Sequence, residues 1–248
     1  MQSLINLVLF VTFLCNTNAE HGQLPSYMKK CDLKHGFSDC VKAQIEKSLP
    51  LFTKGIPELG VPSTDPVLLD DIRLDGNGLN LSFTNAAMHG LSKCLLTQLK
   101  VDIGTEEEEF DLAFKGNLSL TAKYNIDGKI LILPIVGEGD ATVIAQNIEV
   151  NIQSKLAHVK DSKGQSHLKL VTPNYKYDIQ RTIFDLKNLF NGNKELAATT
   201  LTFANENWRQ LMDDLSPPII KQIVRTVVKA INKFFSKIAI SDMISGYN

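Results

Sequence analysis

The sequence predicts an α+β fold in which a long antiparallel sheet is followed by a long amphipathic helix. Apolar residues recur with a period near two over roughly a hundred residues after Pro62, which is typical of half-buried strands. The period changes to nearly four between Ile219 and Ile238, as expected for a helix. The turn signals between the strands favour successive hairpins and no βαβ units.

Residues 1–19 are interpreted as a secretory signal peptide. An apolar run from Leu4 to Cys15 precedes the small residues Thr17 and Ala19, which predict cleavage after Ala19. The run is too short to span a bilayer. We therefore expect a single domain over residues 20–248 that is secreted into an extracellular fluid.

Charge and cysteine content restrict the function classes. The chain has 26 basic and 27 acidic residues, so no overall field favours nucleic acid. Cys31 and Cys40 are close in sequence and are predicted to form a disulfide in an oxidising compartment. The apolar neighbours of Cys94 favour an inert buried thiol, with an intermolecular bridge as the alternative.

The first helix is expected from Ser38 to about Thr53. Val41, Ile45, Leu49 and Phe52 fall on one side of it, Pro50 should bend its last turn, and Gly55 is placed to end it.

The first strands carry two glycosylation sequons. Leu79, Leu81 and Phe83 alternate with Asn80 and Ser82, and Leu118 and Leu120 alternate with Asn117 and Ser119. This alternation directs Asn80 and Asn117 away from the apolar face, so both could carry glycans in a secreted chain.

Residues 129–136 are apolar on both faces and are interpreted as one strand that breaks at Gly137-Glu138-Gly139, a sheet corner. Further turns are expected at residues 161–164 and near Pro173-Asn174.

The last helix is predicted to begin at Ser216, an N-cap, with Pro217 at its first position and with Asp213 and Asp214 favouring its N-terminal dipole. It has two distinct faces. The apolar stripe consists of Ile219, Ile220, Ile223, Val224, Val227, Val228, Ile231, Phe234, Phe235 and Ile238, and the basic row of Lys221, Arg225, Lys229, Lys233 and Lys237. We expect the helix to be half buried, with the basic row in water.

Catalytic and metal-binding patterns are weak. Residues 90–94 resemble a nucleophile elbow around Ser92 but lack its final glycine, so an ester hydrolase is a remote alternative and no enzyme is expected. The five histidines, at positions 21, 35, 89, 158 and 167, are expected on the surface without metal-site spacing. Glu106 to Glu109 is expected to be a solvated turn. We predict no metal and no cofactor.

Several passages, in order, resemble the insect takeout and juvenile hormone-binding protein family. They cover essentially the whole mature chain. They are Leu24-Pro25 with Cys31 and Cys40; residues 55–62 with Asp65-Pro66; Tyr124 with Gly128-Lys129 and residues 133–139; residues 188–192; and residues 205–208.

The resemblance implies a super-roll, in which a highly curved antiparallel sheet wraps the long C-terminal helix and encloses a hydrophobic tunnel. It also implies a carrier of a juvenile hormone-like terpenoid or fatty-acid-like lipid in haemolymph or chemosensory fluid, tied to circadian, feeding or chemosensory physiology. Cys31 and Cys40 match the family's N-terminal bridge. The absence of further paired cysteines favours the takeout-like branch. The expected ligand-binding residues are Val41, Ile45, Phe52, Leu131, Leu133, Ile223, Val227, Ile231 and Phe235.

Two rival functions remain open from sequence. One is a secreted signalling protein with a filled core, because an ordinary core would also account for the apolar residues. The other is a membrane-surface lipid-transfer protein that uses its basic row. We expect a monomer whose partner is a small hydrophobic ligand, with transient membrane or receptor contact through the basic row.

Overall fold

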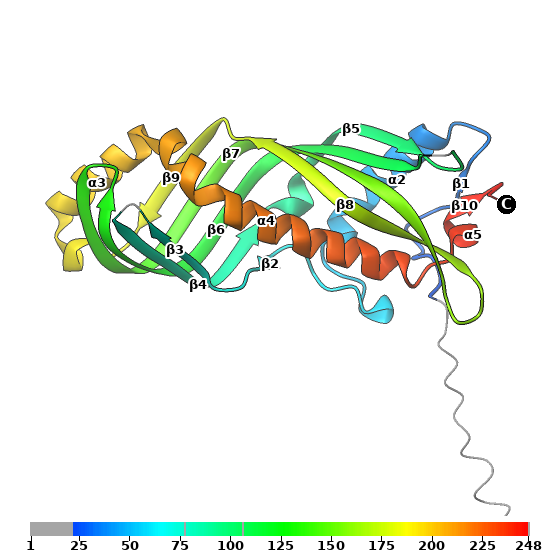
Figure 1. Cartoon of the computed structure of the whole chain (residues 1–248), viewed down its shortest axis with the longest axis horizontal. Helices are drawn as coiled ribbons and strands as arrows, with labels where there is room; N and C mark the ends of the chain where they lie inside the picture. The colour runs from blue at the N-terminus through cyan, green and yellow to red at the C-terminus, as the bar shows by residue number, and fades with distance from the viewer. Residues whose placement is uncertain (1–21, 77, 106, 248) are drawn as a thin grey trace, which may run out of the picture.

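The computed structural model describes residues 22–76, 78–105 and 107–247, and the expected signal peptide lies outside them. A curled antiparallel sheet surrounds a long helix, α4 (Trp208–Phe235), that runs along the long axis of the molecule (Figure 1). The predicted α+β class and the wrapping of the sheet around the C-terminal helix are confirmed.

Two long central strands organise the sheet, namely β6 (Glu109–Ile130) and β7 (Leu133–Lys160). They pair with each other along almost their whole length, and shorter strands extend the sheet on either side. On the β6 side lie β2 (Val67–Leu68), β3 (Ile72–Gly76), β4 (Leu79–His89) and β5 (Leu95–Asp102). On the β7 side lie β8 (Ser166–Asp178) and β9 (Arg181–Leu186).

Each long strand serves both ends of the molecule. At one end β6 pairs with β4 and β7 pairs with β9, and at the other end β6 pairs with β5 and β7 pairs with β8. The predicted alternation is confirmed, since Leu81, Phe83, Leu118 and Leu120 are buried while Asn80 is exposed. The inner faces of these strands and α4 share one core.

Short elements close the two ends. Helix α2 (Phe37–Phe52) fits the predicted first helix and continues through Pro50. At the same end β1 (Cys31–Asp32) pairs in parallel with β10 (Ile244–Ser245), which follows the short helix α5 (Ile240–Met243). At the far end lies α3 (Lys194–Glu206), a helix that the sequence analysis did not predict. Single 3-10 turns are η1 (Pro57–Leu59), η2 (Leu91–Lys93) and η3 (Phe190–Gly192).

The predicted start of the last helix at Ser216 was wrong. Helix α4 begins eight residues earlier, at Trp208, and passes through Ser216, Pro217 and Pro218. The prolines remove the N–H groups that would bond to the carbonyls of Asp213 and Asp214, and both residues are exposed, so solvent can satisfy those carbonyls. The Ser216 hydroxyl donates to the carbonyl of Met212, and the two aspartates lie within the helix instead of preceding it.

The predicted strand over residues 129–136 was also wrong. Residues 131 and 132 form the turn between β6 and β7, where Leu131 has a φ of 54°. β7 then runs straight through the expected break. Gly137 and Gly139 instead allow the backbone of residues 187–189 to pass close to β7. A Cβ on Gly139 would lie 2.6 Å from the carbonyl oxygen of Lys187.

The turn over residues 161–164 is confirmed between β7 and β8, but the turn expected near Pro173 is a bulge within β8. Gln153 pairs with Asn174 and Lys155 pairs with Val171, so two residues of β8 face the single residue Ser154 of β7. A bulge tolerates Pro173, which has no N–H to donate to a ladder.

Asparagine side chains join the helices to the outer strands. Asn232 of α4 donates to the carbonyl of Leu170 in β8 at 3.0 Å and accepts from its N–H at 2.8 Å. Asn205 of α3 makes the same pair of bonds to Phe184 in β9, at 3.0 and 2.7 Å. Each side-chain amide therefore provides hydrogen-bond partners for the N–H and the C=O of one residue, on a sheet edge that pairs with no further strand.

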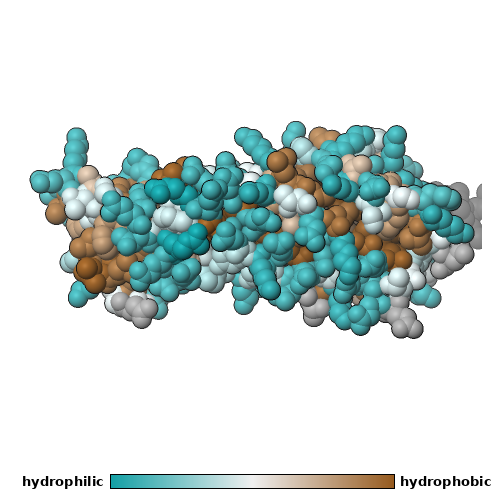
Figure 2. Space-filling view, turned by 90° about the horizontal axis from the view of Figure 1, so that it is seen from above, coloured by the Kyte–Doolittle hydropathy of each residue, from teal (hydrophilic) through white to brown (hydrophobic). Residues whose placement is uncertain are grey.

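Polar residues cover most of the face shown in Figure 2, and hydrophobic residues gather toward the two ends of the long axis. Of the helices in the described part of the chain, none combines the length and apolar character needed to cross a membrane.

Candidate ligand-binding site

A cavity of about 310 Å³ lies between α2, the inner face of the sheet and the C-terminal half of α4. Its wall is almost entirely apolar. The N-terminal segment contributes Leu24 and Met28, and the C-terminal segment contributes Met243 and Ile244. Chain segments from both termini therefore close the same end of the cavity.

The structure brings seven of the nine expected ligand-binding residues to this wall. Val41, Ile45 and Phe52 come from α2, and Ile223, Val227, Ile231 and Phe235 come from α4. Six of the seven are only half-buried, Ile223 being the buried one. Leu131 and Leu133 do not line this cavity, because they belong to the β6–β7 turn and the start of β7.

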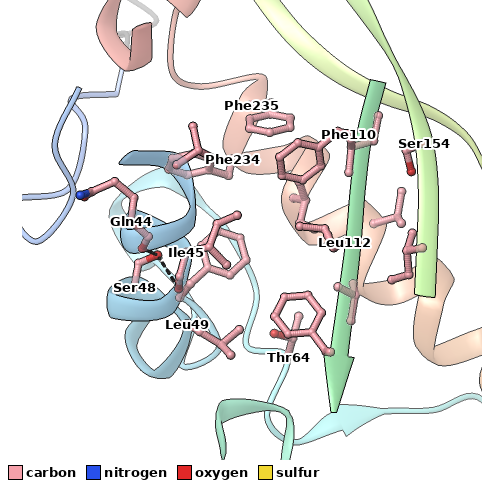
Figure 3. A pocket seen from close by; sticks show the side chains of 18 of the residues that line it. Gln44, Ile45, Ser48, Leu49, Thr64, Phe110, Leu112, Ser154, Phe234 and Phe235 are labelled. Carbon is pink, nitrogen blue, oxygen red and sulfur yellow. Dashed lines mark hydrogen bonds between the residues drawn. The ribbon is translucent and has the colours of Figure 1, made fainter. Parts of the chain in front are cut away.

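The polar side chains at helix α2 that line the cavity make hydrogen bonds within the helix or to the N-terminal segment. The Ser48 hydroxyl donates to the carbonyl of Gln44 at 2.6 Å, as the dashed line in Figure 3 shows. The Thr53 hydroxyl donates to the carbonyl of Leu49 at 2.8 Å, and the Gln44 side-chain oxygen, Oε1, accepts from the N–H of Lys29 at 2.8 Å. Because a helix offers a carbonyl one turn back, these hydroxyls are satisfied locally.

The sheet wall of the cavity was missed from sequence. Every second residue of β7 from Ile148 to Ser154 lines it, and β6 contributes Phe110, Leu112 and Phe114. Figure 3 shows Phe110 and Leu112 facing α2 across the space. The alternation of apolar residues was the available signal, but it does not distinguish a wall that faces a cavity from one that faces a filled core.

Charge is confined to one position on the wall. Among the described residues, Lys29 is the one charged lining residue, and it is exposed, which places it at the rim. The interior therefore suits a neutral or weakly polar molecule, since no cationic group inside would balance an anion.

Cys94 also lines the cavity, as a half-buried free thiol. Burial, with a smaller effect from the negative charge of Asp65, raises the pKa of the thiol to about 11. A raised pKa lowers the fraction of thiolate at neutral pH, and the inert thiol stays a prediction.

Ser92 is part of a turn, not of a nucleophile elbow. Its hydroxyl and N–H both donate to the carboxylate of Asp65, and the N–H of Gly90 donates to the same group at 3.0 Å. The hydroxyl is directed at an acid, with no histidine between them to act as a base. Residues 91–93 form the 3-10 turn η2.

The histidines and acids differ from prediction at three positions. His167 is buried, 4% exposed, and its Nδ1 contacts the carbonyl oxygens of Phe235 and Ile238, so the expected surface position was wrong. Glu108 contacts His158, and Glu109 pairs with Lys100 at 2.7 Å, so these two acids are not simply solvated. His21 and Glu106 lie outside the described residues. Within the described ranges, no three His, Cys, Asp or Glu side chains form a metal-binding group.

The disulfide between Cys31 and Cys40 is confirmed. It joins β1 to α2, and β1 pairs with β10 near the C-terminus, so the bond fixes α2 to the end of the cavity where the two termini meet.

The basic row lies on the solvent side of α4, as expected. Lys221, Arg225, Lys229 and Lys233 are exposed, whereas Lys237 is half-exposed and follows the end of the helix.

Comparisons with known proteins agree with this architecture. Residues 8–245 match the model of the family described as haemolymph juvenile hormone binding protein. The circadian clock-controlled protein daywake of Drosophila melanogaster is 31% identical over 215 residues, which cover 83% of this chain and 82% of that protein. Daywake of Drosophila yakuba is 32% identical over 213 residues, 79% of this chain and 78% of that protein.

A solved structure shows the same fold. Takeout 1 of Epiphyas postvittana superposes with a TM-score of 0.79 at 30% sequence identity, covering 88% of this chain and all of that one. Sequence and structure thus agree over nearly the whole length, and the chain belongs to the takeout and haemolymph juvenile hormone-binding protein family.

Proposed function

We propose that the protein is a non-enzymatic carrier that binds one elongated hydrophobic molecule, such as a juvenile hormone-like terpenoid or a fatty-acid-like lipid, in the cavity beside α4. The observation that carries the proposal is the cavity of about 310 Å³, with an almost wholly apolar wall. Such a space favours binding, because apolar surface of both ligand and wall leaves water. It supports a carrier over a signalling protein with a filled core.

The expected affinity is adequate for transport. A ligand that buries about 300–400 Å² of apolar surface gains about 8–10 kcal/mol, at about 25 cal/mol per Å². Losses of translational and conformational freedom of several kcal/mol leave an affinity in the micromolar to nanomolar range.

The direct test is displacement of a fluorescent apolar probe from delipidated protein that begins at Glu20. Juvenile hormone, fatty acids and plant terpenoids serve as competitors. Saturable displacement at a ratio of one to one supports the carrier. A probe that never binds would argue for function through the protein surface.

Replacing Val227 by Trp locates the site. Val227 is half-buried on the cavity wall, so an indole there fills space that the ligand needs, and we expect at least tenfold weaker binding with a retained fold. The matched control is Val159→Trp, at an exposed valine of β7 away from the wall. Unchanged affinity in Val227→Trp would place the site elsewhere.

Secretion and glycosylation form part of the proposal. Asn80 and Asn117 are both exposed on outer positions of their strands, and the Asn117 side-chain oxygen accepts from the N–H of Asn147 at 2.8 Å. Intact mass of the protein released from insect cells, before and after glycosidase, tests both points. Absence of the chain from the medium would contradict secretion.

A second proposed role is delivery at a membrane surface through the basic row of α4. The exposure of four cationic side chains along one face supports it. Anionic headgroups would attract these charges, and salt would screen the attraction.

The names of the daywake relatives support a further link to circadian output, which daily sampling of the protein in its tissue would test.

A further inference from the structure

One hydroxyl on the cavity wall, that of Ser154, is buried without a hydrogen-bond partner among the described residues. Ser154 continues the row of Ile148, Val150 and Ile152 along β7, at the position where the alternation would place another apolar residue. Ser154 is 4% exposed, and its Oγ has no hydrogen-bond partner among the described residues. The other buried hydroxyls without a partner, those of Tyr27 and Thr182, belong to residues away from this wall.

The lack of a partner follows from the strand. A helical serine can donate to a carbonyl one turn back, as Ser48 and Ser216 do, but an extended strand offers no such acceptor. Ser154 also faces the bulge of β8, and its direct neighbour on β6 is Phe110, which has no group to accept the hydroxyl proton. Figure 3 shows Ser154 on its strand beside Phe110.

An isolated buried hydroxyl is unfavourable in the empty protein, and a bound molecule can remove that cost. The hydroxyls of Ser48 and Thr53 and the side-chain oxygen of Gln44 already have partners, and Thr64, another lining residue, is not among the buried groups without one. Rotation about χ1 lets the serine Oγ choose among staggered positions, so it can meet a ligand oxygen at the wall. A ligand oxygen at this position would therefore gain a hydrogen bond that a pure hydrocarbon cannot make.

The chemistry of the neighbours restricts the ligand group further. Phe110 and Ile152 flank Ser154, and the one charged lining residue, Lys29, lies at the exposed rim. An ionised carboxylate at Ser154 would lose its hydration without a compensating positive charge. A neutral oxygen with lone pairs, in contrast, needs a single donor.

We infer that Ser154 is the polar anchor of the cavity and that the preferred ligand is an elongated apolar chain with a neutral oxygen, as in an ester, ketone or ether, next to this hydroxyl. The inference rests on the proposed carrier function and narrows its ligand class from hydrophobic molecules in general to oxygen-bearing ones.

The test compares two competitors of equal chain length, methyl dodecanoate and tetradecane, by displacement of the fluorescent probe. One hydrogen bond should make the ester bind about fivefold more tightly than the hydrocarbon in the wild-type protein. In Ser154→Ala this ratio should fall to about one, mainly through weaker ester binding. Dodecanoic acid, titrated at neutral pH, should bind less tightly than the ester.

Matched variants separate a local effect from a general one. Thr182→Val removes another buried hydroxyl without a partner, away from the wall, and should keep the fivefold ratio. Ser154→Cys replaces the hydroxyl by a weak donor of similar size and should also lower the ratio, which keeps the comparison available if the alanine variant folds poorly. Thermal unfolding of each variant checks the fold.

The outcomes distinguish the two proposals. If neither competitor displaces the probe from the wild type, the carrier function fails. If both bind and the ester ratio is the same in wild type and Ser154→Ala, the carrier stands and the assignment of Ser154 is wrong. If dodecanoic acid bound more tightly than the ester, the proposal that the ligand carries a neutral oxygen would be wrong.

Discussion

At the scale of single residues, Asp65 shows how one carboxylate fixes the wall of the cavity. It accepts from the N–H groups of Gly90 and Ser92 and from the Ser92 hydroxyl. The turn that it holds carries Leu91 and leads to Cys94, both on the wall. Burial alone would raise the pKa of Asp65, but the hydrogen bonds, first those from Ser92, outweigh burial and lower it.

We therefore expect Asp65→Ala to lower the free energy of unfolding by about 1–3 kcal/mol, measured by urea denaturation. A lowered folded-state pKa means that this stabilisation is complete above the unfolded pKa, about 4, and is lost as the pH falls through the folded value. The difference between wild type and variant should thus shrink in acid. Asp71→Ala, at an exposed aspartate, is the control, and an equal loss in both variants would contradict the role of Asp65.

The role of a side chain can be predicted from sequence where its residue type usually has a single role. Cys31 and Cys40 pair as expected, because two nearby cysteines in a chain that is predicted to be exported have few alternatives. Serine is ambiguous, since its hydroxyl can cap a helix or donate to a carbonyl within it. The Ser216 hydroxyl donates to a carbonyl within its helix, and the Ser154 hydroxyl neither caps a helix nor donates to a carbonyl. The role of these two serines could therefore not be predicted from residue type.

At the scale of elements, Asn232 of α4 links the helix to the sheet through its two hydrogen bonds to Leu170 of β8. Replacing Asn232 by Leu leaves the N–H and C=O of Leu170 without these partners, so we expect a loss of about 2–4 kcal/mol in unfolding free energy. Amide hydrogen exchange should accelerate along β8 near Leu170.

The control for this variant is Gln210→Leu, at an exposed glutamine of the same helix. Retained protection of β8 in Asn232→Leu would show that packing alone holds α4 in place.

The boundaries of elements were harder to predict than their types. The period of two identified β4 and β6, and the period of four identified the C-terminal half of α4. The start of α4 and the whole of α3 were missed because prolines and asparagines usually interrupt helices. Here Asn193 caps α3 by accepting from the N–H of Leu196 at 3.1 Å, and exposed backbone tolerates the two prolines of α4.

At the scale of the whole molecule, the exposed basic residues on α4 give a testable route to membranes. The protein should bind vesicles that contain anionic lipid, and binding should weaken strongly as salt increases. Each cation near such a surface contributes up to about 1 kcal/mol, so Lys229→Glu with Lys233→Glu should weaken binding at least tenfold in a vesicle sedimentation assay.

Lys42→Glu with Lys47→Glu, at exposed lysines of α2, makes the same change of charge elsewhere and is the control. Equal effects of the two pairs would indicate attraction by net charge alone.

The fold class and the position of the helix inside the sheet could be predicted, whereas the shape of the cavity could not. Seven expected residues lie on its wall, because the inner faces of α2 and α4 are set by helical period. Leu131 and Leu133 lie away from this wall, because residues 129–136 form the end of β6, a turn and the start of β7 instead of one strand. Whether apolar faces meet or stay apart depends on the curvature of β6 and β7, which no local pattern encodes.

The length of β6 and β7 has a consequence for cargo release. Since both strands pass through the cavity end and the α3 end, neither end can melt without withdrawing hydrogen-bond partners from the other. The described chain should therefore behave as a single cooperative unit, and partial unfolding is a costly way to discharge a bound molecule. The strands β1 and β10 at the cavity end belong to a separate sheet of only two residue pairs, so we expect unloading to begin with their separation and not with opening of the large sheet.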